Sequence, residues 1–171
     1  MFAVGDVVLH TSQGVCRVDD IRDEKFSGMN RTYYVLLPME NNGKSTTYVP
    51  VDAPKSPIRK LLTEEQIKEV IQVSMNETTD WIDNNNVRKS AYMEILRSDD
   101  ISRILSLIVC LYKRRESVLS QGKKFPVVDE RIMTEAERKI HQEFSYTLSI
   151  SEKDVPRYIK MCIMDVAGQK G

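Results

Sequence analysis

The hydrophobic pattern of this chain changes from β-like to helical near residue 60, and that change limits the fold more than any other feature. Before it, short runs rich in β-branched and aromatic residues are separated by glycine and Asn-Gly signals. These runs lie at 4–9, 15–21, 33–37 and 46–51. After it, apolar residues recur at helical spacing. We therefore predict an α+β protein with one domain over 1–60 and a second over 61–171.

The first domain is predicted to be a small, strongly bent antiparallel β-barrel, with a short additional strand around Ile58. Asn42 and Gly43 both tolerate positive φ, so we expect a tight hairpin between the runs at 33–37 and 46–51. The second of these runs carries Pro50, and proline is confined to sheet edges or strand ends because it cannot donate to a ladder. This strand is therefore predicted to lie at an edge, where an unpaired backbone can bind another chain.

The second domain is predicted to be a helical bundle, with helices at 63–75, 79–97, 100–117, 134–149 and 151–166. Capping signals mark three of these starts, each a hydroxyl residue followed three positions later by a polar partner. The pairs are Thr63 with Gln66, Thr134 with Glu137 and Ser151 with Asp154.

The helix at 100–117 is expected at the centre of the bundle. Asp99 and Asp100 precede it as a cap, and it is apolar around most of its circumference except for a strip through Ser102 and Ser106. Between Gln121 and Met133 the periodicity breaks, so we predict a surface loop there.

The sequence contains none of the common catalytic or metal-binding motifs. Its two histidines, His10 and His141, fall in different segments, and Cys16, Cys110 and Cys162 are too far apart for a paired-thiol site. We expect the cysteines to be buried and reduced, and the protein to be a non-enzyme without cofactor or metal. The first residues lack a secretory pattern and no apolar stretch is long enough to cross a bilayer, so a cytoplasmic location is expected.

Trp81, the single tryptophan, is the strongest candidate for contact with a partner. Its neighbours at helical spacing are polar, with Asn84, Asn85 and Arg88 following it. A structural role is the alternative, because an approximate helical wheel places Trp81 on the same side as Tyr92, in the core stripe. Twenty-five basic and twenty-five acidic residues cancel, so no overall positive field would hold nucleic acid without help.

Four short motifs in the first domain resemble the opening of the CarD/CdnL family of bacterial transcription regulators. They are Phe2-Ala3-Val4-Gly5-Asp6-Val7-Val8, Gln13-Gly14-Val15, Tyr33-Tyr34-Val35-Leu36 and Tyr48-Val49-Pro50-Val51-Asp52. A looser match continues through Trp81, the joint Leu96-Arg97-Ser98-Asp99-Asp100 and the apolar helix that follows. The resemblance covers nearly the whole chain.

This resemblance implies a Tudor-like barrel that binds the β subunit of RNA polymerase by joining strand edges. It further implies a helical domain that places a tryptophan at the minor groove, at the upstream edge of the promoter bubble. The implied polymerase-binding residues are Arg22, Glu24, Lys25, Thr46, Thr47, Tyr48, Val49 and Pro50. The implied DNA-binding residues are Trp81, Asn85, Arg88 and Lys89.

Many members of this family follow the tryptophan closely with basic residues, whereas here Asp80 and Asp83 flank it and Asn84-Asn85-Asn86 come next, which should reduce phosphate attraction. Tyr48 and Glu24 lie near positions at which some relatives present arginine to the polymerase. The predicted function is stabilisation of the open promoter complex by a protein that is brought to the nucleoid through RNA polymerase. The alternative is a polymerase-bound adapter that uses its helical domain for another protein and never contacts DNA.

Overall fold

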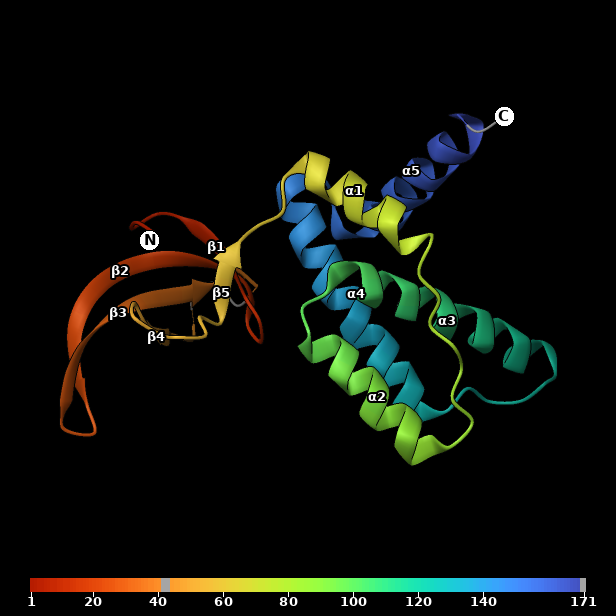
Figure 1. The fold of residues 1–171 in the computed structure, drawn as a ribbon, viewed down its shortest axis with the longest axis horizontal. Helices are drawn as coiled ribbons and strands as arrows, with labels where there is room; N and C mark the ends of the chain where they lie inside the picture. Colours follow the sequence, from red (N-terminus) through yellow and green to blue (C-terminus); the bar gives the residue numbers. More distant parts are fainter. Residues whose placement is uncertain (41–43, 170–171) are drawn as a thin grey trace. The chain divides into compact units, whose positions relative to one another are not determined.

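The computed structural model describes residues 1–40 and 44–169, and it divides the chain into two compact units, Met1–Leu61 and Leu62–Gly171 (Figure 1). The first unit is an antiparallel sheet and the second is built from helices. The α+β class predicted from the sequence is confirmed. In the described part of the chain, no helix is both long and apolar enough to cross a membrane.

Five strands form the sheet of the first unit, in the spatial order β4-β3-β2-β1-β5. They are β1 (Val7–His10), β2 (Gly14–Phe26), β3 (Met29–Pro38), β4 (Thr47–Pro50) and β5 (Ile58–Lys60). The sheet is open rather than the closed barrel expected, since β4 and β5 form its two margins and do not pair with each other. Both marginal strands are short. Prolines at 50, 54 and 57 have no backbone N–H, so this segment cannot donate the hydrogen bonds that longer strands would need.

Strands β2 and β3 form a hairpin that extends well beyond the predicted runs, as the long curved pair in Figure 1 shows. Ser27 and Gly28 close it with φ angles of 52° and 83°, and two successive positive φ values are typical of a type I′ turn. The predicted pairing of β3 with β4 is confirmed, with Leu36 opposite Thr47. The predicted Asn42-Gly43 turn between them lies outside the described residues.

The core of the sheet unit contains Val8, Cys16, Val18, Leu36 and Val49, all buried. Burial raises the pKa of the Cys16 thiol to about 11, so it is protonated at neutral pH, as expected of a reduced core cysteine. The other two cysteines, Cys110 and Cys162, are free but only partly buried, so the prediction of full burial was wrong for them.

His10 gives the sheet unit a pH-dependent stability. Its Nδ1 accepts hydrogen bonds from the backbone N–H groups of Ser12 and Gln13, each at 3.2 Å, and burial lowers the pKa of the imidazole below its ordinary 6.5.

Because the pKa is lower in the folded state, this stability is fully present above pH 6.5 and is lost as the pH falls through the folded pKa. We expect the free energy of unfolding from urea titrations to fall between about pH 7.5 and pH 5.5 in the wild type and less in His10→Asn. Equal slopes in the two proteins would contradict this account.

The helical unit contains five α-helices and one 3₁₀ turn within the described residues. They are α1 (Glu64–Ser74), α2 (Asn85–Arg97), α3 (Ile101–Ser120), α4 (Val127–Leu148), the turn Glu152–Asp154 and α5 (Val155–Gln169). Helix α4, and not α3 as predicted, is the central element, because it packs against α1, α2, α3 and α5 (Figure 1). The buried positions of α3 end at Leu111, so its C-terminal half contributes less to the core.

Two helices begin at positions that the sequence analysis missed. Helix α2 starts at Asn85 instead of residue 79, because Asn84 caps it by accepting from the N–H groups of Asn86 and Val87. Helix α4 starts at Val127 instead of 134, after Pro126, so the predicted 121–133 loop is confined to its first residues. Thr134 lies inside α4, where its hydroxyl donates to the Glu130 carbonyl rather than capping a helix.

Other predicted caps are present. Thr63 and Gln66 form the reciprocal capping box of α1, and Asp100 accepts from the Arg103 N–H at the start of α3. Ser151 accepts from the Lys153 N–H, but it caps the 3₁₀ turn rather than α5 directly. The polar ends of these elements are therefore satisfied locally.

Candidate functional site

The β4 margin of the sheet is the first candidate site. Among residues 1–40 and 44–169, strand β4 pairs with β3 on one side only. The Val51 N–H donates to the Thr32 carbonyl at 3.0 Å, and alternation along an antiparallel ladder then turns the backbone N–H and C=O of Tyr48 away from β3. Pro50 has the same orientation, at a position where a missing N–H costs the ladder nothing. Tyr48 therefore presents both a donor and an acceptor to the free side of the strand.

An aromatic and basic patch lies beside this margin, formed by Arg22, Phe26, Tyr33 and Tyr48. The Arg22 guanidinium donates to the Tyr48 hydroxyl at 2.8 Å and lies 5.7 Å from the centre of its ring. Phe26 makes edge-to-face contacts with Tyr33 and Tyr48, with centroid distances of 5.1 and 5.4 Å. Because Phe26 remains 44% exposed, part of this patch is open to a partner.

The predicted polymerase-binding residues are distributed unequally around the patch. Glu24 accepts from Arg22 Nε at 2.8 Å and so joins it, whereas Lys25 is exposed on the opposite face of β2. Thr47 begins β4, and Thr46 directly precedes it. Val49 is 2% exposed and its backbone is bonded towards β3, so it holds the margin in place and offers no contact of its own.

Trp81 is the second candidate site, and it lies in the loop between α1 and α2 rather than in a helix. Its side chain is half-buried and packs against the core of the helical unit. Two guanidinium groups contact the indole, with Cζ of Arg88 4.1 Å and Cζ of Arg114 4.9 Å from its centre. Arg114, on α3, is exposed and brings positive charge to the ring.

Arg88 is buried, contrary to its predicted role as a DNA contact. It is 3% exposed, and all five of its N–H donors have partners in the protein. Nε and Nη2 bind the two carboxylate oxygens of Asp129 at 2.9 and 2.8 Å, and Nη2 also donates to Asn85 Oδ1 at 2.9 Å. Nη1 donates to the carbonyls of Ile82 and Asp83 at 2.7 and 3.2 Å. The Asp129 carboxylate raises the pKa of Arg88 further above its usual value. Phosphate contact by Arg88 would require breaking these bonds.

Asn85 and Lys89, the other predicted DNA-binding residues, are both exposed near the start of α2. Asn85 directs its side-chain oxygen to Arg88. Lys89 lies on the outer side of the helix and is available to solvent. The structure therefore places Asn85 against the Arg88 guanidinium and leaves Lys89 exposed on α2. Arg114 is an exposed cation in contact with Trp81.

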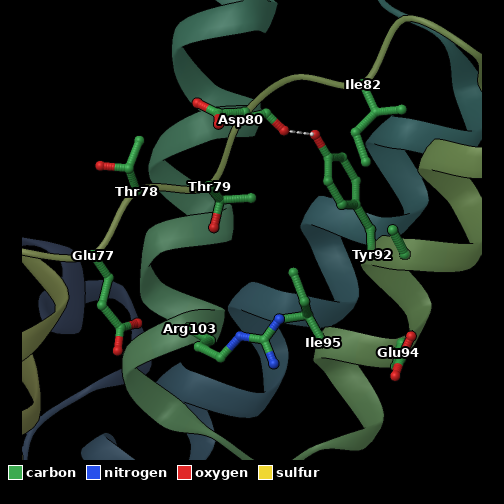
Figure 2. A pocket seen from close by; sticks show the side chains of 10 residues that line it. Glu77, Thr78, Thr79, Asp80, Ile82, Tyr92, Glu94, Ile95 and Arg103 are labelled. Atoms are coloured by element: carbon green, nitrogen blue, oxygen red, sulfur yellow. Dashed lines mark hydrogen bonds between the residues drawn. The ribbon is translucent and has the colours of Figure 1, made fainter.

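A hollow of about 650 Å³ lies beside the Trp81 loop, between the loop, α2 and the start of α3 (Figure 2). Thr79, Asp80 and Ile82, on either side of Trp81 in the chain, line it. Figure 2 shows the Tyr92 hydroxyl pointing towards Asp80, whose backbone carbonyl accepts its hydrogen bond at 2.9 Å. The loop backbone is thus bonded to α2 at this wall.

The polar strip of α3 explains the path of this loop. Ser106 accepts a hydrogen bond from the Thr79 hydroxyl at 3.0 Å and donates to the Glu77 carbonyl at 3.3 Å. Ser102 donates to the Glu77 carboxylate at 3.0 Å. Both serines are buried under the loop. The polar strip predicted from the sequence therefore forms the hydrogen bonds that hold the N-terminal part of the Trp81 loop on α3.

Comparison with known families identifies the first unit. Residues 2–62 match the family described as CarD-like/TRCF RID domain. The sheet unit is a CarD-like RNA polymerase-interacting domain. This finding confirms the resemblance for the motifs of the first unit, and it supports an RNA polymerase-interacting, transcription-related protein. CarD-like domains of this kind are non-enzymatic interaction modules.

Several residues around the two sites were not identified from the sequence. Phe26 was the easiest of them to find from the sequence, because residues two apart in a strand share one face, and Phe26 therefore lies on the same face as Arg22 and Glu24. Asp129 had no local signal, since its partner Arg88 lies 41 residues earlier in the chain. Arg114 was considered only as part of the Lys113-Arg114-Arg115 run, whose usual interpretation is a solvated helix segment.

Proposed function

We propose that this protein binds the β subunit of RNA polymerase through the β4 margin of its CarD-like domain and stabilises the open promoter complex through Trp81. The proposed binding to polymerase rests on the unpaired margin at Tyr48, which belongs to a domain of a polymerase-interacting family. An extended strand of the partner adds to such a margin by backbone hydrogen bonds, and the Arg22 patch supplies side-chain specificity. In this proposal, the binding of polymerase is non-covalent and involves no chemical reaction.

For the second half, the proposed contact is between Trp81 and the minor groove at the upstream edge of the bubble. An aromatic ring at a distorted base step stabilises melted DNA without reading its sequence. Exposed Arg114 and Lys89 supply the charge for phosphate contact, with Arg88 acting on Trp81 and not on DNA. Zero net charge is compatible with this role, because docking on polymerase raises the effective concentration of the helical unit at the promoter.

The alternative is a protein adapter that binds polymerase in the same way but contacts a second protein through its helical unit. Two observations favour it: Trp81 packs partly into its own core, and three acidic residues line the neighbouring hollow against one basic residue, Arg103. The acidic residues are Glu77, Asp80 and Glu94. These negative charges repel phosphate.

The lifetime of open complexes, measured with purified polymerase, distinguishes the two functions. We expect wild-type protein to lengthen this lifetime and Trp81→Ala to return it to the value measured without the protein. Ile82→Ala is the matched control, because Ile82 is the next residue, is also half-buried and packs against the same core. Each substitution removes only part of the roughly 2–5 kcal/mol that a fully buried side chain provides.

Retention of the β subunit on immobilised protein is measured in parallel. An unchanged lifetime with Trp81→Ala, in a folded protein that still binds polymerase, would reject the DNA contact and favour the adapter. Failure of the wild-type protein to retain the β subunit would reject both functions.

A further inference from the structure

The backbone on both sides of Trp81 is held by two side chains that lie one turn apart on α2. On the N-terminal side, the Tyr92 hydroxyl donates to the Asp80 carbonyl at 2.9 Å (Figure 2). On the C-terminal side, Arg88 donates to the carbonyls of Ile82 and Asp83. The three flanking peptide groups are therefore tied to one rigid helix, although Trp81 itself belongs to a loop.

Arg88 is in turn fixed by Asp129 on α4. The side chains are 4% and 1% exposed, and the two parallel hydrogen bonds between them form a planar fork. That fork orients the remaining N–H groups towards the loop and sets the guanidinium plane 4.1 Å from the indole centre. Lysine cannot reproduce this arrangement, since it has neither the planar fork nor the second nitrogen that reaches the carbonyls.

We propose that Arg88 and Tyr92 are positioning residues for Trp81, with Asp129 as the anchor that orients Arg88. The three side chains fix the indole before any partner arrives. Fixing a contact residue in advance removes the ordering cost that a mobile loop would have to meet on binding. The inference concerns the same site as the proposed function and rests on it for its consequence at DNA, but not for its structural part.

A purely structural role is the competing explanation, in which the buried pair only joins α2 to α4. The two explanations differ in what happens to Trp81 when the pair is replaced by packed apolar side chains. Such a replacement commonly preserves or restores folding. It would leave the indole environment unchanged if the pair were purely structural, and would release it if the pair positions the loop.

Two variants of the full chain test this proposal. The double variant Arg88→Met with Asp129→Leu removes the pair and the bonds from Arg88 to Asn85, Ile82 and Asp83. Tyr92→Phe removes the bond to Asp80 and the contact of the hydroxyl with Cys110 Sγ, which does not belong to the loop. Arg97→Met is the control, since Arg97 is an exposed arginine on the same helix. Because Trp81 is the single tryptophan, its fluorescence and the indole band of the near-ultraviolet circular dichroism report on this loop alone.

In each of the two variants we expect the indole dichroism to be lost and collisional quenching by acrylamide to rise, with the far-ultraviolet spectrum unchanged. The lengthening of open-complex lifetime by the protein should be lost with it, whereas Arg97→Met should match the wild type in every measurement. Tyr92→Phe preserves the ring of Tyr92 and therefore tests the proposal even if the double variant fails to fold.

An indole signal that stays unchanged in either folded variant would overturn the proposal. A released indole in variants that still lengthen the open-complex lifetime would leave the positioning role intact and remove Trp81 from the DNA contact. The failure of the inference and the failure of the proposed function are thus distinguishable.

Discussion

Tyr48→Pro is expected to weaken retention of RNA polymerase several-fold more than Tyr48→Val, since one hydrogen bond contributes a net of about 1 kcal/mol. Proline at residue 48 removes the one backbone N–H of β4 that points to the free side of the sheet, and it leaves the bonds to β3 in place. Valine removes the same ring and hydroxyl but keeps that N–H and suits a strand. The difference between the two variants therefore isolates the backbone contribution from that of the Arg22 patch.

Retention is measured by pull-down of purified polymerase, with circular dichroism and thermal unfolding to confirm that both variants fold. Phe26→Ser serves as the reciprocal variant, because it removes the exposed aromatic ring from the patch and leaves the backbone of β4 unchanged. Equal retention by Tyr48→Pro and Tyr48→Val would show that the β4 margin does not pair with the polymerase. A loss with Phe26→Ser alone would move the contact to the patch.

Asp129→Leu is expected to lower the free energy of unfolding by about 3–5 kcal/mol, because it leaves the Arg88 charge buried without its partner. Adding Arg88→Met should recover most of that loss, to within about 1 kcal/mol of the wild type, since two apolar side chains then pack where two ions had to be desolvated. The effect is large because Arg88 and Asp129 are nearly inaccessible to solvent, unlike the exposed pair of Lys68 with Glu64.

Urea denaturation of the four proteins in this double-mutant cycle gives the coupling energy of the pair. Lys68→Met is the control for loss of a surface ion pair, and we expect it to change the free energy of unfolding by less than about 1 kcal/mol. A double variant as unstable as Asp129→Leu alone would show that the bonds from Arg88 to the loop carbonyls, and not the ion pair, carry the stability.

The parts of the fold that local chemistry determines were predictable from the sequence. The pairing of β3 with β4, the position of β4 at a margin and the capping box at Thr63 each depend on residues close together in the chain. The α4 start was missed because Thr134 and Glu137 imitate a capping box inside a helix, while the true start at Pro126 carries no side-chain cap.

The candidate site was less predictable because its decisive contacts are distant in sequence. Trp81 was identified by its uniqueness, but its surroundings depend on Asp129 and Arg114, which belong to other helices. A basic residue near a tryptophan suggests a DNA contact when only spacing is known. Burial of Arg88 against a carboxylate reverses that interpretation, and burial is a property of the folded chain.

The shortness of β4 has a consequence for how long the protein stays on its target. Only Tyr48 offers both a donor and an acceptor along the margin, and a neutral hydrogen bond contributes a net of about 1 kcal/mol. A strand pairing with so few hydrogen bonds dissociates quickly. If the proposed pairing is correct, we expect rapid exchange between free and polymerase-bound protein. Such turnover would let one molecule serve successive initiation events and depart before the enzyme moves away from the start site.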